Sequence, residues 1–192
     1  YDNWRERNEA YIDSLNLIIG GRADRIIEGA KYEGDNGDSV KLSKIPVGEL
    51  FAIKDNYKST TENSLYIYCK KISPDNPYGE RPLYTESVTT YYYGTIILGD
   101  GFDGNFVGYS AIDRGVLLSE GEGAKVPTDF DSPSSFSVTG VVSGWTTVLQ
   151  YMHTKERWIL YIPYQCGYGE SGYGSILGYS TLTFDMQLEA VK

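Results

Sequence analysis

The sequence predicts an α+β fold in which several antiparallel strands surround one short helix. Two observations lead to this prediction. From about residue 64 onward, segments rich in β-branched and aromatic residues recur between turn-forming residues, which is typical of strands. One helical start, Ser143-Gly144-Trp145, interrupts them, and the other clear helical spacing lies in the first 19 residues. Several strands around one helix favour an antiparallel α+β domain.

The N-terminal third is expected to be helical at its start. Residues 1 to about 19 carry apolar residues at roughly helical spacing, and Gly20-Gly21 ends the run. The apolar positions are Trp4, Tyr11, Leu15 and Ile18. A weaker helical pattern covers residues 22–30, a turn-rich break covers 33–38, and a short strand or lead-in covers 47–53.

Strands are expected to dominate the remainder. The predicted strands are 65–72, 88–98, 136–138, 158–162 and 182–188, and the predicted helix runs from Ser143 through Met152. A loop containing Pro, Gly and Asn at 73–83 separates the first two strands. Residues 104–135 carry Gly, Pro, Asp and Ser throughout, so this segment is expected to be irregular.

The charge of the chain argues against nucleic acid as a partner. Its 192 residues include 17 Lys and Arg against 26 Asp and Glu, a net charge of −9, with no dense basic cluster to neutralise phosphates. No apolar run approaches the roughly 18–20 residues needed to span a bilayer. The 18 Tyr and 22 Gly fit either a β-rich globular domain or a Tyr-lined binding surface.

Motifs of cofactor and metal chemistry are present only in fragments. Segments 99–104 and 167–172 match G-x-G-x-x-G, but neither precedes a helical pattern, so both are interpreted as turns. Asp100 could begin a calcium loop, yet Ala111 stands where such a loop needs Glu. His153 is the only histidine, which leaves few zinc or Ser/His arrangements. We therefore expect no metal and no cofactor.

Cys69 and Cys166 leave two alternatives open. They fit no metal spacing, and the apolar stretch around Cys69 favours a buried free thiol, while a disulfide between them would require an oxidising compartment. The sequence begins at Tyr1 without an initiator Met. This is expected of an exported protein that has lost its leader, and equally of a shortened chain.

Four segments together resemble the FKBP-type peptidyl-prolyl cis-trans isomerases. They are Tyr92-Tyr93-Gly94, Val141-Val142-Ser143-Gly144-Trp145, the run from Tyr161-Ile162-Pro163 into Gly167-Tyr168-Gly169, and Ser180-Thr181-Leu182-Thr183-Phe184-Asp185. In that family the Val-Ile-x-Gly-Trp run opens the one helix, a Tyr-containing loop lies over a cleft, and the last segment closes the sheet. The resemblance implies an FKBP-like antiparallel β-sheet wrapped around one short helix, with an N-terminal helical extension.

The resemblance also implies a division of the chain. Residues 1–63 form the N-terminal helical extension and lead-in, and residues 64–192 form the isomerase domain. The segment between Phe102 and Trp145 is longer than in small members of the family. Residues 104–135 are therefore interpreted as an insertion beside the cleft. Tyr173 stands where small members often have a histidine.

Site residues follow from the resemblance position by position. Catalytic roles fall on Tyr92, Phe102, Asp103, Trp145, Tyr168 and Phe184, and substrate binding falls on Val141, Val142 and Ile176. The family's Phe-Asp pair follows the glycine of its Tyr-x-Gly by eight positions, which favours Phe102-Asp103. A second pair, Phe130-Asp131, competes for this assignment.

The implied function is isomerisation of X-Pro bonds in exported proteins. Apolar side chains would remove water from the amide and favour its twisted transition state without proton transfer. The alternative is a non-catalytic FKBP-fold binding or chaperone module. The implied ligands are proline-containing polypeptides and a macrolide that fills FKBP clefts.

The first residues resemble the helical lead-in of envelope FKBPs of Bacteroidetes. This implies an exported or lipid-anchored protein of the cell envelope or periplasm. In relatives such helices can form homodimers or hold client proteins. Packing of this helix on its own domain is an equal alternative.

Overall fold

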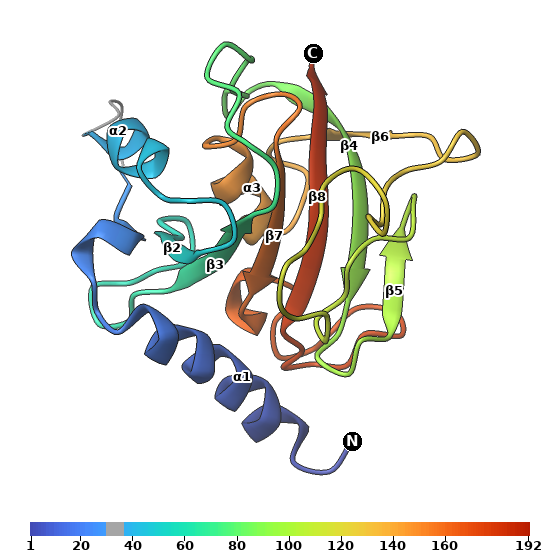
Figure 1. Ribbon diagram of the computed structural model, residues 1–192. Coiled ribbons are helices and arrows are strands. Elements are labelled where there is room, and N and C mark those ends of the chain that lie inside the picture. The colour runs from blue at the N-terminus through green and yellow to red at the C-terminus, as the bar shows by residue number, and fades with distance from the viewer. Residues whose placement is uncertain (30–36) are drawn as a thin grey trace.

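The computed structural model describes residues 1–29 and 37–192 and shows an α+β fold built on one eight-stranded sheet (Figure 1). The helices are α1 (Trp4–Ile19), α2 (Asp38–Ser43) and α3 (Ser143–Leu149). The strands are β1 (Ile26–Ile27), β2 (Leu50–Lys54), β3 (Tyr66–Lys71), β4 (Ser87–Thr95), β5 (Gly101–Gly104), β6 (Ser134–Ser137), β7 (Arg157–Ile162) and β8 (Leu182–Val191). The predicted fold class is confirmed.

The sheet is antiparallel almost throughout. Its order is β1-β2-β3-β7-β8-β4-β5, and β6 pairs with β4 on the edge that β5 also uses. Among the described strands, only β1 and β2 run parallel. β8 lies between β4 and β7, and its register sets Phe184 opposite Gly94.

Alternation of side chains along the strands gives the sheet two different faces. On the inner face, apolar side chains such as Phe184, Leu160 and Cys69 pack against α3 in the main core. On the outer face, their sequence neighbours such as Ile159 and Tyr68 pack against α1 and against Tyr109 of the β5–β6 connection. The strands β1, β2, β3 and β7 therefore contribute to two separate cores.

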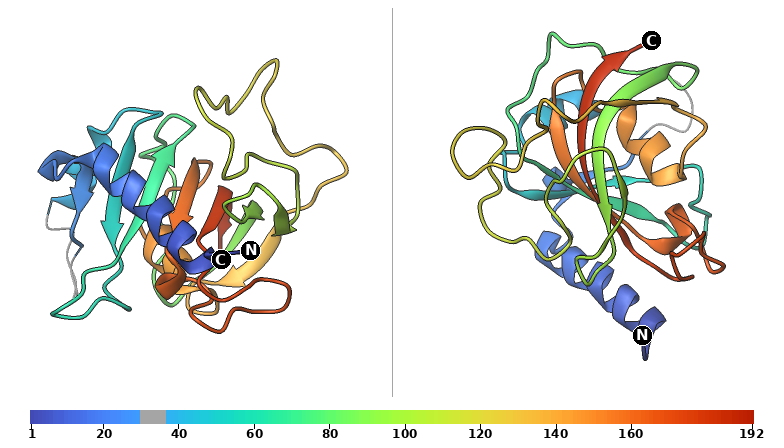
Figure 2. Two further views of the ribbon diagram at one scale, coloured as in Figure 1. Left: turned by 90° about the horizontal axis from the view of Figure 1, so that it is seen from below. Right: turned by 90° about the vertical axis from the view of Figure 1, so that its right-hand side faces the viewer.

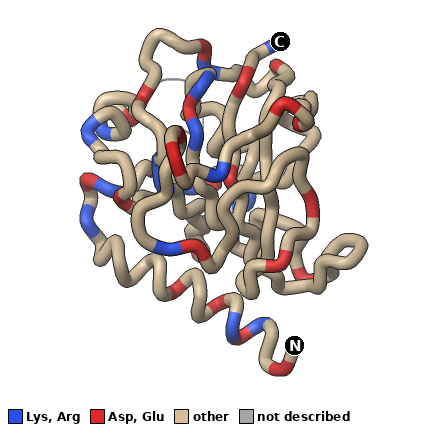
Figure 3. Tube along the Cα trace, turned by 45° about the vertical axis from the view of Figure 1, so that its right-hand side comes forward, with Lys and Arg blue, Asp and Glu red and all other residues tan. Residues whose placement is uncertain are grey.

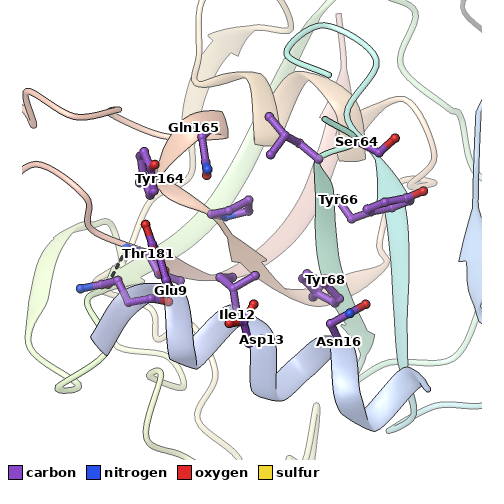
Figure 4. A pocket seen from close by; sticks show the side chains of 13 residues that line it. Glu9, Ile12, Asp13, Asn16, Ser64, Tyr66, Tyr68, Tyr164, Gln165 and Thr181 are labelled. Carbon is purple, nitrogen blue, oxygen red and sulfur yellow. Dashed lines mark hydrogen bonds between the residues drawn. The ribbon is translucent and has the colours of Figure 1, made fainter. Parts of the chain in front are cut away.

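Helix α1 packs on the outer face through buried polar contacts as well as apolar ones. The side-chain amide of Asn8 is fully buried. Its Nδ2 donates to the Trp4 carbonyl at 2.7 Å. Its Oδ1 accepts from the Thr181 amide at 2.7 Å, which is the dashed line beside Thr181 in Figure 4. The Trp4 indole donates to Ser180 Oγ at 3.0 Å. The helix is thereby tied to the loop that leads into β8.

The connection from β5 to β6 crosses the outer face before it returns to β4. Its first part is buried through Phe106, Tyr109 and Ala111. The remainder, yellow-green to yellow in Figure 2, loops out from the sheet. The buried part of this connection covers the face opposite to α3, whereas the sequence placed the whole insertion beside the cleft.

The structure corrects several predicted elements. The helix predicted at 22–30 is wrong over its described residues, because Ala23–Arg25 form a 3-10 turn and the β-branched pair Ile26–Ile27 joins the sheet beside β2. Ala30 and residues 33–36 of the predicted break lie outside the described residues. Residues 101–104, interpreted as a turn, form β5.

Both cysteines are free and buried, Cys69 on β3 and Cys166 in the 3-10 turn Tyr164–Cys166 after β7. Burial raises the pKa of the Cys69 thiol well above its ordinary value, so the thiol stays protonated. In the described part of the chain, no helix combines the length and the apolar character that crossing a membrane requires.

Candidate active site

The strands β4 and β8 place two aromatic rings on the inner face. Tyr92 and Phe184 are both buried and their ring centroids lie 6.4 Å apart. Gly94 stands opposite Phe184 in the register. A Cβ at Gly94 would lie 2.6 Å from the Phe184 ring and 2.7 Å from the Phe102 ring, so only glycine leaves these rings in place. The Tyr-x-Gly motif thus has a packing reason.

Helix α3 supplies the indole at the centre of this site. Every residue from Gly144 to Leu149 is buried, which fixes the short helix within the core. A Cβ at Gly144 would lie 2.8 Å from Ile162, so the glycine permits close approach of α3 to β7. The helix begins after Val142, whose carbonyl accepts from the amides of Trp145 at 2.9 Å and Thr146 at 3.2 Å.

Trp145 and four other aromatic rings pack together, mostly edge to face, and we call these five rings the aromatic cluster. Trp145 lies 5.2 Å from Tyr92, 5.2 Å from Phe136 and 5.1 Å from Phe184, measured between ring centroids. Phe102 completes the cluster at 5.5 Å from Phe184. Near-perpendicular rings place positive ring edges against negative faces, which stabilises the cluster beyond its buried area.

Part of the aromatic cluster is open to solvent. Phe102 and Phe136 are only partly buried, whereas Trp145 is 3% exposed. Phe102 and Ile176 also line a pocket of about 270 Å³ together with Trp4 of α1. The cluster is therefore an apolar surface with a closed floor and an accessible edge.

Polar groups stand at the edge of the cluster. The pKa of the Tyr92 hydroxyl is raised, first by burial and then by a hydrogen bond to Asp103 and its charge. The pKa of the Tyr168 hydroxyl is raised too, first by burial and then by the charges of Asp103 and Tyr173. Both phenols consequently stay protonated at neutral pH and can donate hydrogen bonds.

The loop between the 3-10 turn Tyr164–Cys166 and β8 carries Tyr168 and Ile176. The Tyr168 ring stacks on Tyr173 at 5.3 Å between centroids. Tyr173 and Ile176 exchange backbone hydrogen bonds of 3.0 and 2.9 Å, which closes the loop, and Ile176 is buried in the main core. Gly172 has a positive φ, and a Cβ there would lie 2.2 Å from the Ile176 carbonyl oxygen, so this turn requires glycine.

The structure brings the predicted site residues to one region. Eight of them belong to the main core or pack against it, namely Tyr92, Phe102, Val141, Val142, Trp145, Tyr168, Ile176 and Phe184. The ninth, Asp103, is exposed on β5 and interacts with Tyr92. The competing Phe130 is 98% exposed, away from the aromatic cluster. The catalytic and binding roles of these residues remain predictions.

Sequence reasoning missed two contributors. Phe136 was expected only as a strand residue, and nothing in its local sequence marked it as part of the cluster. Asp55 is fully buried, and its Oδ2 accepts a 2.7 Å hydrogen bond from Ser143 Oγ at the start of α3. These two residues are 88 positions apart, so no local motif could reveal the contact.

No metal site accompanies this arrangement within the described residues, because no group of three or more His, Cys, Asp or Glu is placed to hold an ion there. The site consists of apolar rings with hydroxyl and carboxylate groups at the rim. It can desolvate and orient a bound group.

Comparisons with known proteins agree with this description. The family model of the FKBP-type peptidyl-prolyl cis-trans isomerases matches residues 78–189, more than half of the chain. The isomerase FkpA of Aeromonas hydrophila is 30% identical over 141 residues, covering 73% of this chain and 42% of that protein. The macrophage infectivity potentiator of Trypanosoma cruzi is 42% identical over 72 residues, covering 34% of this chain and 37% of that protein.

A third relative, the outer membrane protein MIP of Legionella longbeachae, is 30% identical over 115 residues, covering 59% of this chain and 40% of that protein. The chain thus spans less than half the length of these three relatives. Among solved structures, a peptidyl-prolyl cis-trans isomerase from Pseudomonas syringae pv. tomato matches with a TM-score of 0.51 at 21% identity, covering 96% of this chain and 95% of that one. At this identity the structural likeness speaks for the fold alone.

Proposed function

The chain belongs to the FKBP-type peptidyl-prolyl cis-trans isomerase family, and from this premise we propose that the aromatic cluster catalyses cis–trans isomerisation of X-Pro peptide bonds. The observation that supports the proposal is the ring arrangement around Trp145, which is closed below and accessible at Phe102. A prolyl ring would lie against Trp145, with Phe184 and Phe102 as side walls.

Desolvation would provide the catalytic effect. Rotation about the X-Pro bond is slow because it sacrifices amide resonance, with a barrier of about 20 kcal/mol. The planar amide is more charge-separated than the twisted one, so an apolar surface that excludes water disfavours the planar ground state. Each tenfold of rate requires about 1.4 kcal/mol, and only contacts stronger in the twisted form contribute.

The polar rim would hold the peptide in place. Tyr168 would donate its hydroxyl hydrogen to a substrate carbonyl, and Tyr92 with Asp103 would orient the prolyl segment. Val141 and Val142, which precede α3, would bind the extended backbone beside the cluster, and Ile176 would contact the side chain. None of these groups would transfer a proton, consistent with the raised phenol pKa values.

The test is a protease-free isomerisation assay on short X-Pro peptides, with and without a macrolide that fills FKBP clefts. We expect catalysis that the macrolide abolishes. Macrolide binding without catalysis would establish the alternative function, a binding or chaperone module. Catalysis that the macrolide leaves unchanged would contradict the assignment of the site to the aromatic cluster.

A hydroxyl deletion tests the role of the rim. Tyr168→Phe keeps the stacked ring but removes the donor, so kcat/KM should fall by about tenfold, the value of one hydrogen bond of about 1.4 kcal/mol. Tyr78→Phe is the matched control, because Tyr78 is 98% exposed, and its activity should equal that of the wild type. Equal activities of the two variants would show that the Tyr168 hydroxyl does not contribute to catalysis.

We place this activity in the cell envelope, on proline-containing polypeptide clients. The relative from Legionella longbeachae is named an outer membrane protein, which supports the location. A homodimer through α1 would use Leu17 and Ile18, the large apolar side chains of this helix that are exposed. Fractionation of cells and sedimentation of the purified chain test the location and the dimer separately.

A further inference from the structure

The outer face of the sheet holds a pocket of about 430 Å³, which we call the outer pocket. Its walls come from α1, β2, β3, β7 and the β5–β6 connection, so five separate parts of the chain enclose it. The volume falls within the roughly 300–1,000 Å³ typical of sites for small molecules. It lies on the opposite side of the sheet from the aromatic cluster, because Tyr161 and Leu50 of its lining belong to the outer core.

The acidic side chains of the outer pocket are already paired. Glu49 accepts a hydrogen bond from Arg25 at 2.6 Å. Asp113 accepts from the Ser110 amide at 2.6 Å and forms an ion pair with Lys125 at 3.4 Å. The negative charge of these two carboxylates is therefore already balanced in part by Arg25 and Lys125.

The basic side chains lack such partners. Lys70 on β3 and Arg114 on the β5–β6 connection form no ion pair or side-chain hydrogen bond with any residue in the described ranges. Burial, and then the Arg114 charge, lower the pKa of the Lys70 ammonium. Arg22 at the rim uses its Nε to reach the Ile19 carbonyl at 3.1 Å. Lys70, which is partly buried, and Arg114, which is exposed, are thus two like charges that interact with each other, and neither forms an ion pair with a described residue.

The hydroxyl of a largely buried tyrosine lines the same space. Tyr161 is 5% exposed, and within residues 1–29 and 37–192 its hydroxyl has no hydrogen-bond partner. The neighbouring Tyr11 ring lies 6.2 Å away, but the Tyr11 hydroxyl already donates to the Ala111 carbonyl at 2.9 Å. The Tyr161 hydroxyl lines the pocket and is not among the buried unsatisfied atoms of the described residues, so it is accessible and can donate a hydrogen bond to a ligand there.

The negative charge of the whole chain makes the unpaired Lys70 and Arg114 unusual. The net charge is −9, and basic positions are scattered among acidic ones along the trace (Figure 3). A pocket with unpaired positive charge stands out against that background. The apolar side of the pocket, which includes Leu15 and Leu50, would favour a ligand that carries an apolar group as well as a charge.

We propose that the outer pocket binds a small organic anion, a carboxylate or phosphate on an apolar body, through Lys70, Arg114 and the Tyr161 hydroxyl. Arg114 would engage the anion through two N–H groups and Lys70 through its ammonium group, which are the usual contacts of these side chains. Leu15 and Leu50 would contact the apolar body. The site is separate from the isomerase site and does not depend on it.

Calorimetric titration of the purified chain tests the proposal, with phenyl phosphate, benzoate and inorganic phosphate as probes. We expect one saturable site for at least one aromatic probe, bound more tightly than inorganic phosphate. Lys70→Gln and Arg114→Gln should each weaken binding at least tenfold, and Tyr161→Phe should weaken it severalfold. Lys44→Gln makes the same charge change at an exposed lysine outside the pocket and should leave binding unchanged.

Two results would overturn the proposal. One is no saturable binding of either aromatic probe at millimolar concentration, and the other is binding that Lys70→Gln and Arg114→Gln leave intact. If inorganic phosphate bound as tightly as phenyl phosphate, the proposal that the ligand carries an apolar body would be wrong. Thermal unfolding without ligand checks the variants, and neither charge removal should lower Tm, because each relieves a like-charge contact.

Discussion

The inner and outer faces of the sheet differ in chemistry although they share the same strands. On β8, Phe184 belongs to the aromatic cluster, and the next residue, Asp185, forms a buried ion pair with Arg157 on the other face. The inner face combines apolar aromatic rings in edge-to-face contact, whereas the outer face carries a buried carboxylate held by directional hydrogen bonds. Strand alternation thus separates the candidate binding surface from its structural support.

The largest effect is expected from breaking the outer ion pair. Arg157 donates to Asp185 twice, at 2.8 and 2.6 Å, and the Tyr109 amide donates to the same carboxylate at 2.9 Å. Asp185→Ala would leave the guanidinium buried without its partner, so the free energy of unfolding should fall by about 3–5 kcal/mol. Urea unfolding measures the loss. An equal loss in the exposed Asp129→Ala control would contradict this explanation.

A smaller loss of stability but a clear loss of function is expected on the inner face. Gly94→Ala inserts a Cβ within 2.7 Å of both Phe184 and Phe102. Overpacking of this kind costs about 1–3 kcal/mol, and it should displace Phe102 from the cluster and reduce isomerase activity at least tenfold. Activity is measured below the unfolding transition. Full activity would show that the Phe102–Phe184 contact is not part of the site.

The anchor of α3 links the inner face to the N-terminal segment. Ser143→Ala leaves Asp55 Oδ2 without the donor that lies at 2.7 Å, and a buried unsatisfied acceptor costs about 1–3 kcal/mol. The free energy of unfolding should fall by that amount, measured by urea titration. Ser132→Ala, at an exposed serine, should be neutral. A neutral Ser143→Ala would show that α3 is held by packing alone.

Alkaline pH should weaken the outer face through its phenols. Burial, followed by the Tyr66 and Asp13 charges, raises the pKa of Tyr68 to about 12, above the ordinary value of about 10. The folded state therefore keeps the proton longer than the unfolded chain. The stability from this group is fully present below about pH 10 and is lost as pH rises through about 12.

The measurement is urea unfolding at pH 9 and pH 11. Tyr68→Phe should make the loss of stability between these values smaller than in the wild type, while Tyr78→Phe should leave it unchanged. If Tyr68→Phe lost as much free energy of unfolding between pH 9 and pH 11 as the wild type, the alkaline effect would come from groups other than Tyr68.

The sequence predicted the strands of residues 64–192 better than the elements of the N-terminal third. Strand periodicity located the cores of β3, β4, β7 and β8, and the N-terminal spacing located α1. β5 escaped prediction because its glycines are typical of turns, and its pairing with β4 is a tertiary property. The predicted α3 extended to Met152, but the structure ends it at Leu149.

The residues of the candidate site were predicted mainly from the family resemblance, because aromatic residues are too common in strands to indicate a site by themselves. Spacing favoured Phe102 over Phe130, and the structure places Phe102 in the aromatic cluster while Phe130 is 98% exposed. Contacts between distant segments, such as Asp55 with Ser143 or Asn8 with Thr181, could not be predicted because they arise only in the folded chain.

One matched pair of variants tests most directly whether the aromatic cluster is the catalytic surface. Phe102→Ala and Phe130→Ala remove the same side chain, one at the accessible edge of the cluster and one in solvent. In the X-Pro isomerisation assay, Phe102→Ala should lower kcat/KM at least tenfold, and Phe130→Ala should match the wild type. Equal activity of the two variants, with folding verified for both, would contradict a catalytic role of the aromatic cluster.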